Sequence, residues 1–428
     1  MVVTDAVVIG SGFAGIQAVK SILARSPRMT VTLVSRTPYA TMLPALPDVL
    51  SGRVRKDVLA TPLADIFRKD LAGFDSRSSG TGSSGSESSE SAGDSDHGRV
   101  HLLIGNVSGI ELERRILTVD DGKLAYRSLV IAHGSTPNFF GFTPQGGTLY
   151  TVDTLDHARE LRREFTRRER SASSGGGPVQ VVVVGAGYTG LEICMSLKHG
   201  ARSAGLPEPE ITVVEAADRM LPFLSDRERE YVARYLEQAG VTILLDTALT
   251  SYDGMTATLS NGTAINGALV CWAAGMHSGG VEIVGTVDRT RDGRLKTNEY
   301  LQLPDYPEVF VAGDAAAIAK NGTVQRRAIN FAYYSGRTAG ANLARRESQG
   351  TRLKPFRPVD LGWIIPLGGI SLGHALGFLR IRGRIGLRMH YAMCGFRHFR
   401  WEEARDFYRT AFRLSRVPDS IAAEEDRS

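Results

Sequence analysis

The fold is decided by two stretches of sequence, AVVIGSGFAG at residues 6–15 and VVVVGAGYTG at residues 181–190. Each begins with an apolar run typical of a buried strand and passes through the spacing GxGxxG into a helical run. In such a unit the first glycine makes a tight turn, the second lets a pyrophosphate approach the backbone, and the third lets the helix pack on the strand. The phosphates then lie at a helix N-terminus. One such pattern is weak, but two, each followed by a further apolar strand at residues 31–34 and 211–214, predict two dinucleotide-binding units.

The segments around these units have distinct compositions. Residues 76–98 consist mainly of Ser, Gly, Asp and Glu and have almost nothing apolar to bury, which predicts a disordered surface insertion. Residues 171–177 are typical of a linker. Short apolar strands are expected in five places, at 100–106, 116–119, 128–135 (ending on a glycine turn), 269–275 and 309–314.

The overall composition predicts a globular protein. The chain has 428 residues, of which 42% are hydrophobic and 23% charged. Its three cysteines, Cys194, Cys271 and Cys394, are too far apart in sequence for a dense disulfide framework or a CxxC metal site. We therefore expect no metal and a reducing compartment. The apolar strand at 6–9 is not preceded by a signal-peptide pattern, so we do not expect export.

The charge is unevenly distributed along the chain. The whole sequence carries a net charge of +5, yet residues 351–416 contain thirteen basic and four acidic residues. Between 381 and 400, apolar residues interleave with arginines at helical spacing, which is typical of an interfacial helix on an anionic membrane. A helix packed on its own domain with solvated arginines is the alternative, and nucleic acid is disfavoured. Residues 361–379 are nearly uncharged, but five glycines and Pro366 favour strands or turns over a spanning helix.

On these motifs the chain resembles the flavoproteins with two dinucleotide-binding domains and, within them, the type II NADH dehydrogenases (NADH:quinone oxidoreductases). The resemblance spans nearly the whole chain except the insertion and the last dozen residues. It implies an α/β fold with two Rossmann-like domains. The FAD-binding domain would comprise 1–145 and 291–355, with an NADH-binding domain at 146–290 inserted in it, and the region 356–428 would attach to the membrane through its basic amphipathic helix.

The resemblance assigns the first glycine loop to FAD. Asp314, in the stretch VFVAGD at 309–314, would accept a hydrogen bond from the ribityl chain, and Pro44 opens a segment that lies beside the flavin in the family. Ser35 and Arg36 stand where the family usually has an acid, so the adenosine contact must differ. The residues expected to hold FAD are Gly10, Gly12, Phe13, Ala14, Gly15, Ser35, Arg36, Pro44, Ala132, Gly134, Gly313 and Asp314.

The second loop would bind NADH. Glu215 ends the strand that follows it, where an acid can bind the ribose hydroxyls, which favours NADH over NADPH. Arg219 lies close enough in sequence to leave NADPH open. The residues expected to hold NADH are Gly185, Gly187, Tyr188, Thr189, Gly190, Glu215 and Gly275.

Three residues are predicted to take part in the chemistry. Glu192 aligns with a glutamate that the family places near the flavin and nicotinamide, although a first-turn helix acid is an equal alternative. The family's quinone motif, Ala-Gln-x-Ala-x-Gln-x-Gly, aligns with residues 329–336. Asn330 and Tyr334 stand in place of its two glutamines, and both can hydrogen-bond a carbonyl.

The resemblance therefore implies a peripheral enzyme at the cytoplasmic face of the cell membrane that passes two electrons from NADH through FAD to a quinone, without proton pumping. A homodimer is left open. Three alternatives remain: an enzyme similar to sulfide:quinone reductases, a soluble reductase of a protein electron carrier, and a flavoprotein that switches an interaction with negligible turnover.

Overall fold

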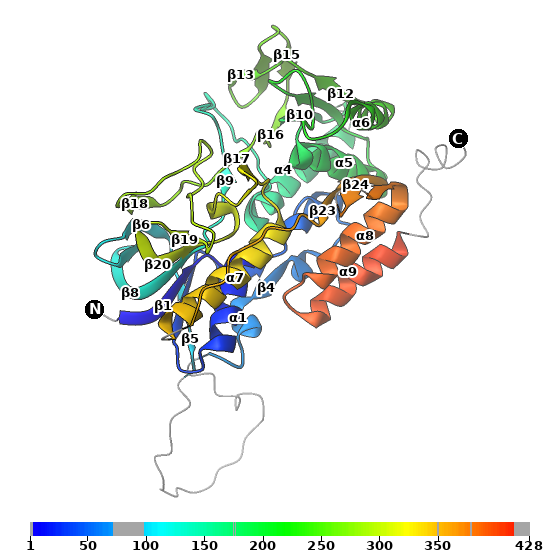
Figure 1. Cartoon of the computed structure of the whole chain (residues 1–428). Coiled ribbons are helices and arrows are strands. Elements are labelled where there is room, and N and C mark those ends of the chain that lie inside the picture. The colour runs from blue at the N-terminus through cyan, green and yellow to red at the C-terminus, as the bar shows by residue number, and fades with distance from the viewer. Residues whose placement is uncertain are drawn as a thin grey trace, which may run out of the picture. The chain divides into compact units, whose positions relative to one another are not determined.

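The computed structural model describes residues 3–71, 98–173, 175, 177–348, 351–376 and 379–414 (Figure 1). The predicted insertion at 76–98 lies outside the described residues, apart from Gly98. The chain divides into two compact units, the first formed by 1–40, 62–135 and 278–359, the second by 41–61, 136–277 and 360–428. The four-part domain division made from the sequence stays a prediction.

The first unit is built on a sheet whose central strands are parallel. In the order β20-β8-β1-β2-β5 these strands are β20 (Tyr306–Val311), β8 (Gly122–Ile131), β1 (Val3–Ile9), β2 (Val31–Ser35) and β5 (Val100–Ile104). The sheet is extended by β6 (Val107–Glu111), β7 (Ile116–Val119), β18 (Glu282–Val284) and β19 (Gln302–Leu303). The apolar runs of β1 and β2 are buried, as parallel strands require. The strands predicted in this part of the chain are confirmed.

Two helices of the first unit pack closely through glycines. A Cβ built on Gly336 or Gly340 of α7 (Ile329–Glu347) would lie 2.1 or 2.2 Å from the carbonyl oxygen of Ala14 or Ala18 in α1 (Phe13–Arg25). Residues four apart share one helix face, so the two small-residue pairs stack along one seam. This seam fixes the helix of the predicted quinone motif against the helix that follows the first glycine loop. The remaining short elements of this unit are α3 (Leu63–Ile66), η3 (Gly313–Ala315), β21 (Ala319–Lys320) and β22 (Thr323–Val324).

The second unit contains a parallel sheet in the order β12-β11-β10-β16. Its strands are β12 (Val241–Leu244), β11 (Glu210–Val214), β10 (Gln180–Val184) and β16 (Leu269–Trp272). Helix α5 (Tyr188–Ser203) follows β10, and α6 (Asp226–Gln238) begins with a capping box formed by Ser225 and Glu228. An antiparallel sheet is formed by β13 (Leu249–Tyr252), β14 (Thr256–Leu259) and β15 (Ala264–Asn266), and β9 (Thr136–Pro137) pairs with β17 (Met276–His277).

The linker predicted from residue 171 begins later than expected. Helix α4 (Leu155–Ser173) continues through residues 171–173, where the Ser171 and Ser173 hydroxyls donate to the carbonyls of Arg167 and Glu169 one turn back. Both serine hydroxyls are therefore satisfied within the helix. The segment 41–61 adds η1 (Leu43–Ala45), α2 (Asp48–Ser51) and η2 (Lys56–Leu59), and the flanking strands are β3 (Tyr39–Thr41) and β4 (Ala60–Pro62).

The C-terminal region forms a small sheet and two helices. The strands predicted within 361–379 are confirmed as β23 (Gly362–Leu367) and β24 (Ile370–Ala375), followed by β25 (Leu379–Arg382), α8 (Gly383–Phe396) and α9 (Trp401–Arg413). Among the described residues, no helix combines the length and apolarity that crossing a membrane requires.

Only part of the apolar surface expected between 381 and 400 is exposed on α8. Leu387 and Tyr391 are fully buried, whereas Ile385, Met389, Met393 and Phe396 are exposed. The helix therefore has a packed face and a separate exposed apolar face.

Candidate functional site

The first glycine loop has the geometry of a phosphate-binding turn. Gly10 has a φ of +99°, its amide donates to the Val34 carbonyl (2.8 Å), and a Cβ there would lie 2.4 Å from the Ala132 carbonyl oxygen. A Cβ on Gly15 would lie 1.8 Å from the Gly10 carbonyl oxygen. Around Gly12, by contrast, no described heavy atom beyond its two chain neighbours lies within 4 Å of such a Cβ, and within the described residues no side chain caps α1. The open second glycine and the uncapped helix N-terminus suit a pyrophosphate.

The second loop repeats this geometry in the second unit. Gly185 has a φ of +107°, and its amide donates to the Val214 carbonyl (2.8 Å). A Cβ on Gly190 would lie 2.0 Å from the Gly185 carbonyl oxygen, while the space around Gly187 is open within the described part of the chain. The three glycines at corresponding positions therefore have the same steric roles in both units, as the GxGxxG spacing predicted.

The two units differ at the end of their second strands. Ser35 is buried, and its hydroxyl lies 2.7 Å from that of Ser11 in the loop and donates to the Thr37 carbonyl (2.8 Å). Arg36 is exposed beside it. This end of β2 thus offers neutral hydroxyls and an exposed cation rather than a carboxylate.

Glu215 places a carboxylate over the second loop. Its two oxygens accept hydrogen bonds from the amides of Ala186 (2.9 Å) and Ala217 (3.0 Å). Arg219 is held by the neighbouring Asp218 through two bonds of 2.9 and 2.7 Å. A fixed negative charge and an arginine already paired with an acid disfavour a 2′-phosphate at this position.

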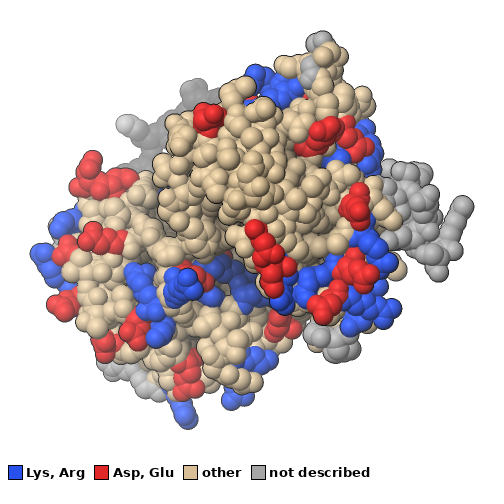
Figure 2. All heavy atoms as spheres, turned by 90° about the horizontal axis from the view of Figure 1, so that it is seen from above, with Lys and Arg blue, Asp and Glu red and all other residues tan. Residues whose placement is uncertain are grey.

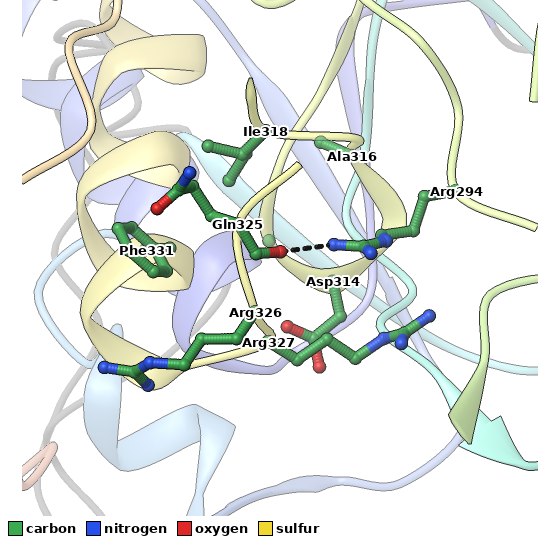
Figure 3. A pocket seen from close by; sticks show the side chains of 9 residues that line it. Arg294, Asp314, Ala316, Ile318, Gln325, Arg326, Arg327 and Phe331 are labelled. Atoms are coloured by element: carbon green, nitrogen blue, oxygen red, sulfur yellow. Dashed lines mark hydrogen bonds between the residues drawn. The ribbon is translucent and has the colours of Figure 1, made fainter. Parts of the chain in front are cut away.

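Asp314 is a half-buried residue of η3, the turn that follows β20. It accepts a hydrogen bond from the Ser135 hydroxyl (3.2 Å), and its backbone carbonyl accepts one from Ser278 (2.6 Å). Burial raises the pKa of this carboxyl, and the nearby charge of Arg327 opposes the rise. The pocket that it lines is also lined by Arg294, Arg327 and Phe331, and Figure 3 shows the Asp314 carboxylate close to the Arg327 side chain.

Arg327 is fixed by a network around this pocket. Its guanidinium pairs with Asp292 (2.9 Å) and donates to the Ser278 hydroxyl (3.0 Å), while Arg294 binds the same aspartate and the Gln325 carbonyl. Asp314 accepts from a single described side chain, so it retains acceptor capacity for a ligand hydroxyl. This donor set and the open loop around Gly12 fit the ribityl and pyrophosphate groups of a flavin dinucleotide.

The crossing segment 131–134 lies beside the first loop. Ala132 supplies the carbonyl that crowds Gly10, and Gly134 has a φ of +79°, which favours glycine. Burial lowers the pKa of His133 to about 4, so this imidazole is neutral. Its Nδ1 lies 3.1 Å from the Gly134 carbonyl, consistent with a structural contact.

The predicted quinone-motif residues differ in their surroundings. The Asn330 amide nitrogen donates to the Val359 carbonyl (2.5 Å), and its buried oxygen has no hydrogen-bond partner among the described residues. Tyr334, one turn along α7, is 37% exposed and lies edge-to-face against Tyr333 (5.2 Å between centroids). Asn330 is therefore anchored by its own chain and keeps an acceptor available.

Glu192 belongs to a buried group in the second unit that the sequence did not reveal. Burial raises its pKa well above the ordinary value, and the charge of Asp48 adds to the rise. Asp48 in turn accepts a hydrogen bond from Tyr391 of α8 (2.7 Å). Asp48 follows Pro44 in the segment expected beside the flavin, and Tyr391 lies in the stretch 381–400 that was expected to face a membrane. No local signal in the sequence links these residues.

Two further predicted residues meet neighbours within the second unit. The Tyr188 hydroxyl donates to the Ile364 carbonyl of β23, which ties the second loop to the C-terminal sheet. Gly275 has a φ of +148°, and its carbonyl accepts from the Asn138 amide (2.9 Å). The roles of these and the other predicted site residues toward ligands stay predictions.

The cysteines are poorly suited to redox chemistry. All three lie in the described part of the chain and are free, buried thiols. Burial raises the pKa of each, to about 12 for Cys271. A buried thiol that stays protonated is inert as a nucleophile.

In each unit a central parallel strand, β1 or β10, ends in a three-glycine turn that leads into a helix with an uncapped N-terminus, and this repeated arrangement defines a protein that binds two dinucleotides. The chain belongs to the pyridine nucleotide-disulphide oxidoreductase family, whose model matches residues 4–339.

Among curated proteins, the chain is 27% identical to the type II NADH:quinone oxidoreductase of Mycobacterium tuberculosis over 410 residues, which cover 89% of this chain and 81% of the relative. It is 23% identical to the type II NADH:quinone oxidoreductase of Staphylococcus aureus, over 84% of this chain and 87% of the relative.

Solved structures share the fold. NDH2 from Plasmodium falciparum, solved in complex with NADH, superposes with a TM-score of 0.77 at 14% identity, covering 97% of this chain and 98% of that one. The sulfide:quinone oxidoreductase of Aquifex aeolicus gives a TM-score of 0.71 at 15% identity, covering 95% and 92%.

Proposed function

We propose that the protein is an FAD-dependent NADH:quinone oxidoreductase without a proton pump. The observation that carries the proposal is the pair of open, uncapped glycine loops in one chain, whose curated relatives of nearly full length are named type II NADH:quinone oxidoreductases. Two dinucleotide-binding sites in one chain suit a bound flavin cofactor and a nicotinamide dinucleotide substrate.

FAD is assigned to the first unit. The pyrophosphate would lie at Gly12 and the N-terminus of α1, and Asp314 would accept a ribityl hydroxyl. Ser35 and Arg36 would replace the usual acid at the adenosine. When bound, FAD supplies a two-electron relay between NADH and the acceptor. The chain's own contribution is to seat the pyrophosphate, hold the ribityl chain and keep His133 neutral beside the loop.

NADH is assigned to the second unit, with Glu215 selecting against NADPH. Its carboxylate is fixed by two backbone amides, so it cannot turn away from a 2′-phosphate without losing both bonds. Arg219 is occupied by Asp218. Glu192, buried one turn beyond the loop, is assigned the proton chemistry that accompanies electron transfer.

The quinone is assigned to the start of α7. Asn330 would use its unpartnered oxygen to accept a hydrogen bond from the hydroquinone that forms, and the exposed phenol of Tyr334 would donate to a carbonyl. A buried amide oxygen needs a donor, and a hydroquinone hydroxyl provides one.

Attachment to the cytoplasmic face of the membrane is assigned to the C-terminal helices. Ile385 and Phe396 on α8 are each 67% exposed, and they continue a line through Met389 and Met393. Arginines flank this line at 382, 384, 388 and 397, which suits anionic lipid headgroups. On the face drawn in Figure 2, basic and acidic side chains are interspersed, which is unlike the one-sign surface that nucleic acid favours.

A comparison of electron acceptors tests the proposal. We expect the purified yellow protein to oxidise NADH rapidly with a short-chain quinone and to be inactive with sulfide as donor, because its thiols are buried. Deletion of residues 383–428 should abolish vesicle binding. Activity with a small iron–sulfur protein but not with quinone would instead establish the soluble reductase, and slow reoxidation by every acceptor would establish the switch.

A further inference from the structure

Two helices of the second unit bring Asp48 close to Glu192. A Cβ on Gly200 of α5 would lie 2.6 Å from the Leu50 carbonyl oxygen, so glycine at 200 lets α2 lie directly against α5. Arg162 of α4 donates to the same carbonyl (2.7 Å) and holds the end of α2. Glu192 lies two turns before Gly200 on the same face of α5.

Helix α8 closes this site with Tyr391. The phenol donates to Asp48 Oδ1 (2.7 Å), and Arg53 Nη1 donates to the phenol oxygen (3.4 Å). Burial and the charge of Arg53 lower the pKa of the adjacent His390 to about 4, and its Nε2 lies 3.7 Å from the Cys394 thiol. Both groups are therefore neutral near pH 7.

The other elements packed on this site add little charge. On α5 itself, burial lowers the pKa of His199 to about 4, and Lys198 pairs with Glu208 (3.3 Å). Strand β23 presents the sequence GWIIPL, which has no titratable side chain. Among the described residues, the charged groups that act on one another at this site are the two carboxyls and Arg53.

One cation and two buried carboxyls favour a state in which one carboxyl is ionised and the other protonated. Burial raises the pKa of Asp48, but the charge of Arg53 and the hydrogen bond from Tyr391 oppose the rise and stabilise its anion. Glu192 has the Asp48 charge as its main electrostatic neighbour, which opposes ionisation. The surroundings therefore favour an ionised Asp48 and a protonated Glu192.

We propose that Tyr391 and Arg53 are positioning residues that keep the negative charge of this site on Asp48 and the proton on Glu192. This inference rests on the proposed function. In the overall reaction NADH and a quinone consume one proton to give NAD⁺ and hydroquinone, because the hydride carries two electrons and a single proton. Glu192 would store the second proton and recover it from solvent afterwards. The C-terminal helix would thus serve the chemistry as well as attachment.

The test uses the holoenzyme and the variant Tyr391→Phe, which removes one oxygen atom. Without the phenol donor the proton shifts from Glu192 toward Asp48. We expect the alkaline limb of flavin reoxidation by a short-chain quinone to move about one pH unit lower, the size of a lost stabilising neighbour. The rate of flavin reduction by NADH should be unchanged. Tyr408→Phe on α9, the same change on the neighbouring helix, is the matched control and should leave the profile unaltered.

A spectroscopic readout separates this role from a structural one. Infrared spectra of the wild type should contain the C=O stretch of a protonated carboxyl, which Glu192→Gln removes and Tyr391→Phe alters. Asp48→Asn keeps an acceptor for Tyr391 but removes the charge, so it should also lower the alkaline limb if Tyr391→Phe does not fold. A wild-type profile and an unaltered carboxyl band in both variants would overturn the proposal. If the wild-type flavin is not reoxidised by quinone, the proposed function fails, and the infrared band still decides the state of Glu192.

Discussion

Two glycines of the second loop allow folding and ligand binding to be separated with one kind of substitution. Gly190→Ala would place a Cβ 2.0 Å from the Gly185 carbonyl oxygen and 3.4 Å from Val183 Cγ1, so the turn must move. Gly187→Ala places the same atom where no described heavy atom beyond the two chain neighbours lies within 4 Å, at an ordinary φ of −83°. Gly190→Ala should destabilise the fold, whereas Gly187→Ala should weaken binding of the pyrophosphate.

The expected magnitudes differ accordingly. Overpacking at Gly190 costs about 1–3 kcal/mol and the helical alanine returns about 0.5–1 kcal/mol, so the free energy of unfolding should fall by about 1–2 kcal/mol. Gly187→Ala should change stability by less than about 0.5 kcal/mol. It should nevertheless weaken NAD⁺ binding about ten- to hundredfold, because a hydrogen bond to a charged group contributes about 1.5–3 kcal/mol.

Urea unfolding and titration calorimetry with NAD⁺, which does not react with oxidised flavin, measure the two quantities on the same preparations. Wild-type affinity in Gly187→Ala would refute the second loop as the pyrophosphate seat. Wild-type stability in Gly190→Ala would refute the close approach of loop and helix.

Three further predictions concern selectivity, pH and the membrane. Glu215→Gln keeps a hydrogen-bond acceptor but removes the negative charge, so the ratio of kcat/KM for NADPH to that for NADH should rise about tenfold. An unchanged ratio would show that Glu215 does not face the ribose. Burial alone would raise the pKa of Glu228, but hydrogen bonds from Ser225 and His374 outweigh it and hold the pKa at about 2 against an ordinary 4.5. The stabilisation from the Glu228 carboxylate is present above pH 4.5 and is lost as the pH falls toward 2. Glu228→Gln should therefore be less stable than the wild type at neutral pH, and its stability should fall less steeply in acid. A fall in acid as steep as that of the wild type would contradict this prediction. The double variant Ile385→Asp/Phe396→Asp should bind anionic vesicles more than about a hundredfold more weakly, because each apolar side chain buried in the membrane contributes about 1.5–3 kcal/mol. The control variant Phe140→Asp, at a phenylalanine that is equally exposed elsewhere, should bind like the wild type. Full binding by the double variant would exclude α8 as the attachment surface.

The loops and strands could be predicted because their signals are local. The spacing of Gly10, Gly12 and Gly15 encodes one turn, one open approach and one close contact, and the structure shows each of them. The same reasoning separated the strands within 361–379 from a spanning helix, because five glycines and Pro366 are incompatible with one.

The buried acid site could not be predicted, since its members come from segments far apart in sequence. The spacing of apolar residues along α8 does not show which of them face solvent and which face protein. Tertiary packing buries Tyr391 and leaves Met389 and Met393 exposed. The side-chain amide of Asn330 has a donor nitrogen and an acceptor oxygen, and the sequence does not indicate which of them is already engaged. The approach of the Val359 carbonyl determines that the nitrogen is engaged and the oxygen is left.

The central claim is that electrons pass from NADH through a bound flavin to a quinone. Anaerobic rapid mixing of the holoenzyme with NADH, followed by mixing with a short-chain quinone, observes both transfers in one experiment. We predict fast bleaching of the flavin by NADH, slow bleaching by NADPH, and fast recovery of the yellow colour on adding quinone. Fast bleaching without recovery would contradict the quinone as acceptor, and no bleaching by NADH would contradict the assignment of the second unit.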